Sequence, residues 1–142
     1  MKVSIVSTTT PFVEGGATLI VKWLGEALQA KGHQVETLLI PFSFHPDDIL
    51  SQMIGLSLTD LSAWGERLIA IRTPSYLVRH PYKVLWFIHH HRGAYDLWGT
   101  KYQDIPDSPE GLGLRNAIIE ADQLAFFEAK KLFTNSHVVK ER

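Results

Sequence analysis

Short apolar runs alternate with longer amphipathic segments along the whole chain. Five runs have the length and composition of buried strands, and they cover residues 2–7, 34–40, 68–71, 83–88 and 132–134. The segments between them carry apolar residues at three- and four-residue spacing, which indicates helices with one buried face. Such β–α alternation is typical of a parallel sheet with helices on both faces. The pattern predicts an α/β fold, a Rossmann-like three-layer α/β/α sandwich with a mostly parallel sheet.

Start and stop signals mark the first predicted helix. Gly15 and Gly16 open it, and Lys31 and Gly32 supply a cationic last turn and a glycine stop. A helical or irregular stretch follows at residues 46–64, where the adjacent acids 47–48 are interpreted as a charged helix start rather than a catalytic pair. The predicted buried stripe of the first helix consists of Ile20, Trp23, Leu24, Ala27 and Leu28.

A later helix has a well-formed start at residues 108–110, where serine, proline and glutamate stand in the order preferred for a cap and a first turn. Residues 138–142 are interpreted as the first turns of another helix. The four tryptophans and seven phenylalanines are assigned mostly to the core, and only Trp98 is placed in a polar loop with a candidate functional role. The predicted buried face of the later helix consists of Leu114, Ala117, Ile118, Ala121, Leu124 and Ala125.

Composition narrows the functional classes. The 142 residues suit one domain, and their 45% hydrophobic and 20% charged content is ordinary for a globular chain. A formal net charge of −1 gives no basic field for nucleic acid. The absence of cysteine excludes disulfide frameworks, thiolate nucleophiles and zinc–thiolate sites. No targeting or membrane-spanning segment is recognised, so we expect a cytoplasmic protein.

Several familiar site motifs are absent from the sequence. The first strand is not followed by a Gly-x-Gly-x-x-Gly fingerprint, which disfavours an NAD-linked oxidoreductase. The phosphate-loop motif of nucleotide hydrolases and the Gly-x-Ser-x-Gly elbow of serine hydrolases are missing as well. The candidate chemistry therefore has to come from another arrangement.

Ligands of open parallel sheets bind beyond the carboxyl ends of the strands. The residues just after the predicted strands include most of the chemically versatile side chains of the chain. Glycine amides at a helix start can approach an anion closely, and arginine can clamp a phosphate or a carboxylate. We therefore expect one rim of the sheet to be lined by Gly15, Gly16, Arg72, His89, Arg92 and Ser136.

Three consecutive histidines, His89 to His91, form the densest cluster. A metal site has little support, because neighbouring residues at a strand end point in alternate directions and no further ligand stands at a suitable spacing. Partly buried, hydrogen-bonded histidines are the ordinary alternative. The interpretation carried forward is a substrate-contacting His89, with no metal ligand predicted. Arg92 has its own ordinary alternative, an ion pair with Asp96 four residues on.

Three stretches of the chain contain short motifs that can be compared with those of known families. They are a glycine pair followed by Gly-His-x-Val (residues 15–35), a His-Pro-x-Lys start that runs into Asp-Leu-Trp (80–100, preceded by Ile-Arg-Thr-Pro), and a Phe-Thr-Asn-Ser strand end (133–136). Together they resemble the N-terminal region of the retaining glycosyltransferases of family 4, the group 1 glycosyltransferases. The match is spread over the whole chain, and the stretch 80–100 is its most specific part.

The resemblance implies a two-domain GT-B enzyme, with residues 1–142 as its N-terminal, acceptor-side domain. Because the sequence stops inside a helix start, we expect a truncation before the C-terminal nucleotide-sugar domain. The parent enzyme is expected to transfer a sugar with retention from a nucleotide-sugar donor to a sugar, lipid-linked or other hydroxyl acceptor, without a metal or other cofactor. Peripheral membrane association of the parent is left open.

Residue roles follow from the same resemblance. Gly15 and Gly16 match the loop that approaches the donor phosphates, and His89 matches the catalytic histidine that contacts the donor sugar near the reacting centre. The fragment alone is expected to be inactive, because the second domain holds most of the nucleotide-binding residues. A non-catalytic, flavodoxin-like nucleotide- or ligand-binding module is the alternative. A receiver-like module is disfavoured, because residues 7–10 carry no acid after the first strand.

Overall fold

A computed structural model describes residues 1–13 and 15–141, which fold around one parallel sheet. The strand order is β2-β1-β3-β4-β5, and every neighbouring pair runs parallel. The predicted α/β fold is confirmed. In chain order the elements are β1 (Lys2–Thr9), α1 (Gly16–Ala30), β2 (Gln34–Pro41), α2 (Pro46–Leu58), β3 (Arg67–Ile71), the 3₁₀ helix η1 (Ser75–Leu77), β4 (Lys83–Phe87), α3 (Pro109–Glu128), β5 (Lys131–Thr134) and α4 (His137–Glu141).

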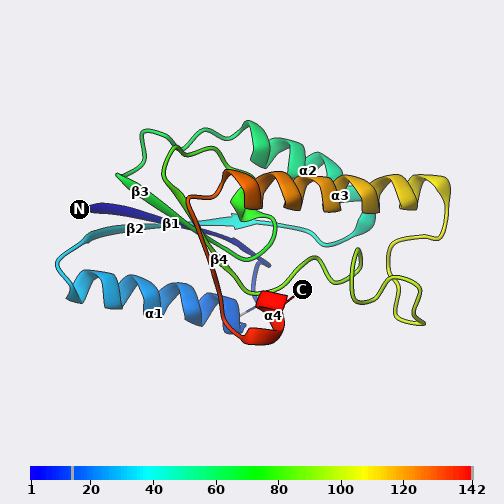
Figure 1. Ribbon diagram of the computed structural model, residues 1–142, viewed down its shortest axis with the longest axis horizontal. Coiled ribbons are helices and arrows are strands. Elements are labelled where there is room, and N and C mark those ends of the chain that lie inside the picture. Colours follow the sequence, from blue (N-terminus) through cyan, green and yellow to red (C-terminus); the bar gives the residue numbers. More distant parts are fainter. Residues whose placement is uncertain (14, 142) are drawn as a thin grey trace.

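Helices cover both faces of the sheet, with α1 on one side and α2 and α3 on the other (Figure 1). Side chains alternate between the two faces along each strand. Ile5 and Ile71 pack under α1, whereas Val6, Leu68 and Leu85 pack under α2 and α3. The core on the α2/α3 side is much the larger of the two, and it includes the aromatic side chains of η1 and of the segment after β4.

The predicted glycine and serine signals of the helices lie where the structure uses them, but Lys31 is the C-cap of α1, whose last turn contains no basic residue. Gly15 is the cap of α1, and Gly32 ends its C-terminal turn at φ +83°, a conformation that favours glycine. Ser108 caps α3 by accepting a 3.1 Å hydrogen bond from the amide of Gly111. A Cβ at Gly111 would collide with the Pro106 carbonyl oxygen, so this close turn requires glycine. These contacts fix the direction in which α1 and α3 leave their loops.

Two predicted core residues lie at the surface instead. Trp23 of α1 is 60% exposed, and Leu124 of α3 is 64% exposed. On both helices, fewer apolar residues are buried than the sequence pattern predicts. On α3, Asp122 is buried instead, three residues before the buried Ala125. Assigning most large aromatic residues to the core was likewise wrong for several of them, since the exposed set includes Phe12, Trp64, Phe127 and Phe133.

The topology places a switch in connection direction between β1 and β3. From β1 the chain crosses to β2 on one side, and from β3 it continues to β4 and β5 on the other. In doubly wound sheets such a switch point opens a crevice at the carboxyl ends of the two strands. Across residues 1–13 and 15–141, no helix has the length and apolar character that crossing a bilayer requires.

Candidate functional site at the carboxyl edge of the sheet

All five strands end at the same edge of the sheet, because they are parallel. The segments that follow β1, β3, β4 and β5 therefore share one edge, and they carry the predicted residues Gly15, Gly16, Arg72, His89, Arg92 and Ser136. Gly16 and His89 each follow a strand that ends at this edge. The contacts of each residue show how firmly it is held at this edge.

Arg72 is held in a fixed turn directly after β3. Its φ of +66° lies in the left-handed region, which costs a non-glycine residue about 1–3 kcal/mol and is concentrated at functional sites. The Ser75 amide donates to the Arg72 carbonyl oxygen at 3.0 Å, and the single proton of the Ser75 hydroxyl lies between the carbonyl oxygens of Ile71 at 2.6 Å and Arg72 at 2.8 Å, which maintains the turn. The sheet therefore presents this cation in a defined place.

The guanidinium of Arg72 points back toward β1 and β2. It lies 5.2 Å from the centre of the Phe44 ring, and its Nη1 is 3.5 Å from the Thr8 carbonyl oxygen. Burial lowers the pKa of Arg72 from its usual value, which still leaves the group charged at neutral pH. Beside it, the Thr8 hydroxyl donates a 2.8 Å hydrogen bond to the Thr73 carbonyl oxygen and joins the ends of β1 and β3. The result is a half-buried positive charge at the switch point.

His89 follows β4 after one apolar residue and is half-buried. Its Nδ1 lies 2.7 Å from the His90 carbonyl oxygen. A carbonyl can only accept, so Nδ1 carries the proton and, in the neutral ring, Nε2 keeps a lone pair. His89 can therefore accept a hydrogen bond from a ligand hydroxyl through Nε2.

His91 is buried and has the opposite proton arrangement. Its Nδ1 accepts a hydrogen bond from the Ala94 amide at 3.3 Å, which leaves the proton of the neutral ring on Nε2. Burial lowers the pKa of His91 and favours this neutral form, despite the nearby Asp104. Its Nε2 is buried and has no hydrogen-bond partner in the part of the chain that the structure describes.

His90 has a packing role. Its ring lies 4.1 Å from the Tyr95 ring and 4.8 Å from the Phe87 ring, measured between centroids, on the α3 side of the sheet. His90 is thus partly buried, as in the ordinary alternative, and these contacts are with aromatic rings. Among residues 1–13 and 15–141, no group of three or more metal-binding side chains converges here or elsewhere.

The remaining predicted residues are less enclosed. Gly15 and Gly16 are exposed at the start of α1, and a Cβ on either would meet nothing within 4 Å. Packing therefore does not require glycine there, and the space is open to a ligand. Arg92 is exposed, and its carbonyl oxygen accepts a hydrogen bond from the Leu97 amide at 2.9 Å. The Ser136 hydroxyl accepts one from the Val139 amide at 3.2 Å, so this side chain caps the short α4.

The structure also places a polar cluster behind this edge that sequence reasoning missed. Asp122 of α3 is buried, and its two carboxylate oxygens accept hydrogen bonds from Tyr76 at 2.5 Å and Tyr95 at 2.9 Å. Burial raises the pKa of Asp122 to about 6, and the two hydroxyl donors oppose that rise. An available signal was the position of Asp122, four residues after buried Ile118 and three before buried Ala125.

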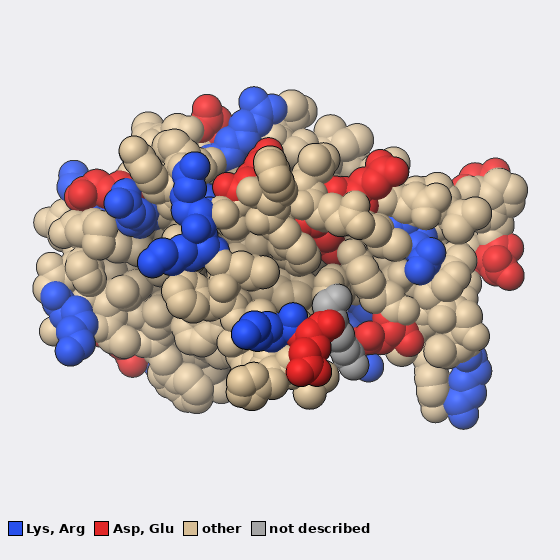
Figure 2. Space-filling model, viewed as in Figure 1, with Lys and Arg blue, Asp and Glu red and all other residues tan. Residues whose placement is uncertain are grey.

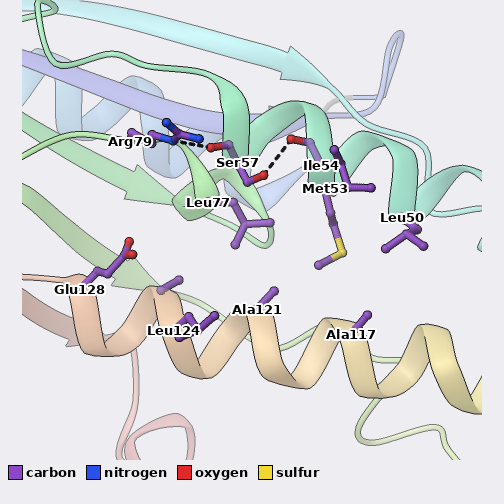
Figure 3. Close-up of a pocket in the computed structure, with 11 residues that line it drawn as sticks. Leu50, Met53, Ile54, Ser57, Leu77, Arg79, Ala117, Ala121, Leu124 and Glu128 are labelled. Carbon is purple, nitrogen blue, oxygen red and sulfur yellow. Dashed lines mark hydrogen bonds between the residues drawn. The ribbon is translucent and has the colours of Figure 1, made fainter.

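An apolar groove lies elsewhere, between α2 and α3 (Figure 3). It has a volume of about 340 Å³, and its walls are mainly aliphatic. Its charged side chains are already bonded: Arg79 donates to the Ser57 carbonyl oxygen at 2.7 Å, and Glu128 pairs with Lys83 at 3.3 Å. On the face shown in Figure 2, acidic and basic residues are interspersed, without a large field of one sign.

Comparison of the chain with protein-family models, with curated proteins and with solved structures finds no match. The structure shows a Rossmann-like α/β domain with a five-stranded parallel sheet.

Proposed function

We propose that this chain is the N-terminal, acceptor-side domain of a retaining glycosyltransferase with the GT-B architecture, and that its carboxyl edge binds part of a nucleotide-sugar donor. One observation carries the proposal. The stretch with the most specific resemblance, residues 80–100, contains β4 and runs out at the same edge as Arg72 and the start of α1. Sequence resemblance and sheet topology thus favour the same small set of residues.

The electrostatics of the edge suit a diphosphate. The amino end of α1 carries the positive end of a helix dipole, and its first turn contains no acidic residue. Arg72 adds a full positive charge held at the end of β3. A donor diphosphate placed over Gly15 and Gly16 would meet the positive end of the helix dipole, with Arg72 at the same edge of the sheet, and Arg92 is a further candidate to clamp a phosphate or carboxylate.

His89 suits the sugar part of the donor. Its Nε2 lone pair can accept a hydrogen bond from a sugar hydroxyl and hold the ring in place. In the transfer itself, the bond between the anomeric carbon and the diphosphate oxygen breaks. The acceptor oxygen bonds to the same face of that carbon, and its hydroxyl proton passes to the leaving diphosphate. Such a front-face reaction depends on positioning and on stabilising the leaving charge, which are the roles given to His89 and Arg72.

The proposal assigns the missing groups to a second domain of the same polypeptide. That domain would hold the nucleotide, and the hydroxyl acceptor would bind on the side of the present domain. The chain of 142 residues by itself is then expected to bind nucleotide sugars weakly and to turn none over. Neither a metal nor nucleic acid is part of the proposed reaction.

The experiment compares His89→Ala with His33→Ala in the full-length parent. His33 precedes β2 and therefore lies toward the opposite edge of the sheet. We expect His89→Ala to lower turnover by about 10²–10⁴-fold, the range for a positioned transition-state group, while His33→Ala keeps wild-type rates. Melting curves of both variants are measured alongside the initial rates. Wild-type turnover by His89→Ala, or unfolding that accounts for all the lost rate, would contradict the proposal.

The strand order supports one competing function. The order β2-β1-β3-β4-β5 is also that of flavodoxin-like domains, whose cofactor binds at the β1/β3 switch point. A non-catalytic nucleotide- or ligand-binding module would use the same crevice beside Arg72. Titration with FMN, UDP-glucose and GDP-mannose separates the two functions. Saturable FMN binding without nucleotide-sugar binding would favour the module.

A further inference from the structure

The carboxylate of Asp122 sits in the middle of α3 and faces the sheet. It is 1% exposed, and its oxygens are shared between two tyrosines from different segments. Tyr76 comes from η1, just after the Arg72 turn, and Tyr95 comes from the loop that begins with the histidines. A buried carboxylate is stable only when its oxygens are bonded, so both tyrosine bonds are needed at once. One side chain of α3 thereby fixes two loops.

The first connection runs to the switch point. Tyr76 Oη lies 2.9 Å from the Thr73 hydroxyl, and the Thr73 carbonyl oxygen accepts the 2.8 Å bond from Thr8. Thr73 is the neighbour of Arg72, so the backbone turn that presents the guanidinium is bonded through Tyr76 to α3. A displacement of Asp122 would therefore shift the backbone at the ends of β1 and β3.

The second connection runs to the histidines. The Tyr95 ring stacks on His90, and the Tyr95 amide donates to the His91 carbonyl oxygen at 3.3 Å. Arg115 of α3 adds a parallel contact by donating from Nε to the Ala94 carbonyl oxygen at 2.9 Å. The loop that carries His89 is thus attached to α3 through Tyr95 and Ala94.

Charged and titratable groups lie around Asp122 on each element that packs against it. Tyr76 belongs to η1, and Tyr95 and His90 to the segment after β4. Arg115 lies on α3 itself, and Lys83 of β4 reaches the far side of Tyr76 by donating to its carbonyl oxygen at 2.7 Å. The two tyrosine hydroxyls bond the carboxylate directly.

We propose that Asp122 is a positioning residue for the carboxyl-edge site, which holds the Arg72 turn and the histidine loop in fixed relation to each other through Tyr76 and Tyr95. The proposal rests on the proposed function only for the identity of the ligand. The connection between the two loops through Asp122 does not depend on that function. Asp122 touches no part of the expected donor. Its effect on binding is transmitted through the two loops.

The connection is tested first without any ligand, by amide hydrogen exchange. Tyr95→Phe removes one bond and should speed exchange at Ala94 and Leu97 by roughly 10- to 100-fold, the scale of a lost bond to a charged acceptor. Tyr76→Phe should do so at Ser75, whose amide bonds the Arg72 carbonyl oxygen. Asp122→Leu should loosen both loops, and Asp122→Asn, which can still bond both hydroxyls, should restore most of the protection.

Tyr102→Phe is the matched control, because Tyr102 is an exposed tyrosine of the same loop. It should leave exchange unchanged at all these amides. Acceleration that equals the change at core amides such as Ile5 and Leu85 would reflect global stability alone and would overturn the positioning role. Equal acceleration of exchange at the same amides in Tyr76→Phe and Tyr95→Phe would also overturn the positioning role.

UDP-glucose and GDP-mannose are then titrated into the parent enzyme, its Tyr95→Phe variant and the Tyr102→Phe control. A roughly tenfold or greater weakening confined to Tyr95→Phe supports positioning of the site. Equal binding by all three proteins overturns it. If neither sugar nucleotide binds the wild type, the proposed function fails, and the exchange pattern alone decides whether Asp122 connects the loops.

Discussion

Tyr76 lies between two buried charges, and the two ends of this residue have very different surroundings. Its carbonyl oxygen accepts a hydrogen bond from the Lys83 ammonium, which also donates to the Val78 carbonyl oxygen at 3.1 Å and pairs with Glu128. Its hydroxyl donates to Asp122, whose other oxygen bonds Tyr95. Lys83 bonds backbone carbonyl oxygens of the segment between β3 and β4, whereas Asp122 bonds side-chain hydroxyls of the segments that follow β3 and β4.

The comparison separates structural burial from positioning. Lys83 bonds the backbone carbonyl oxygens of Tyr76 and Val78, which lie beyond the Arg72 turn, so we expect its contribution to fall mainly on the stability of the whole domain. Asp122 satisfies hydroxyls of side chains that belong to the site loops, so its contribution includes their geometry. Equal burial, at 2% and 1% exposure, therefore does not imply an equal role.

The largest expected effect is that of Lys83→Ala on global stability. The change leaves two buried carbonyl oxygens without their donor and removes the packed side-chain stem, and we expect a loss of about 2–4 kcal/mol. Urea unfolding measures it, and Lys83→Met, which keeps the stem, should recover the packing part only. Selective loosening of residues 72–75 or 89–97 in Lys83→Ala, beyond the global change, would contradict the distinction drawn between the two charges.

A second expectation concerns the pH dependence of stability. Folding raises the pKa of Asp122 from 3.8 to about 6, so its contribution is fully present below pH 3.8 and is lost as the pH rises through about 6. The loss amounts to about 3 kcal/mol at 1.36 kcal/mol per unit. Burial also lowers the pKa of Lys83 from 10.5, but Lys83 is present in both the wild type and the Asp122→Asn variant, so its titration cancels in their difference.

The measurement compares urea unfolding of the wild type and Asp122→Asn from pH 4 to pH 7.5. The amide introduced by this substitution does not titrate, so the wild type should lose stability relative to the variant across the window. The histidines, including His91 with its lowered pKa, contribute equally to both proteins and cancel in the difference. A flat difference across the window would show that Asp122 does not titrate there.

The fold was predictable because its signals are local and agree with one another. The apolar runs gave all five strands to within a few residues, and the signals at Gly15, Gly32 and Ser108 gave the ends of α1 and the start of α3. Parallel pairing then placed the predicted site residues at one edge. Their catalytic and binding roles stay predictions.

The polar cluster behind the edge was not predicted, because its members are far apart in the sequence. Tyr76 and Asp122 are 46 residues apart, and nothing in either local sequence signals the partner. Helical periodicity favoured Leu124 as a buried residue because it weighs apolar character alone. The tyrosines supply hydrogen bonds that make Asp122 acceptable in the core, and a pattern of hydrophobic residues does not contain that information.

The smallest expected effect is that of Glu128→Gln, which removes the anion beside Lys83. The Glu128 side chain is 64% exposed, so solvent screens the 3.3 Å pair and its contribution is limited to less than about 1 kcal/mol. Glu120→Gln, at another exposed position of α3, is the control for the change in helix charge. Because Glu128 raises the pKa of Lys83, its removal should lower that pKa further while both carbonyl bonds of the ammonium remain. Urea unfolding at low and high salt measures the effect. A loss as large as that of Lys83→Ala would mean that the ion pair, and not the carbonyl bonds, holds Lys83 in the core, and the contrast with Asp122 would then fail.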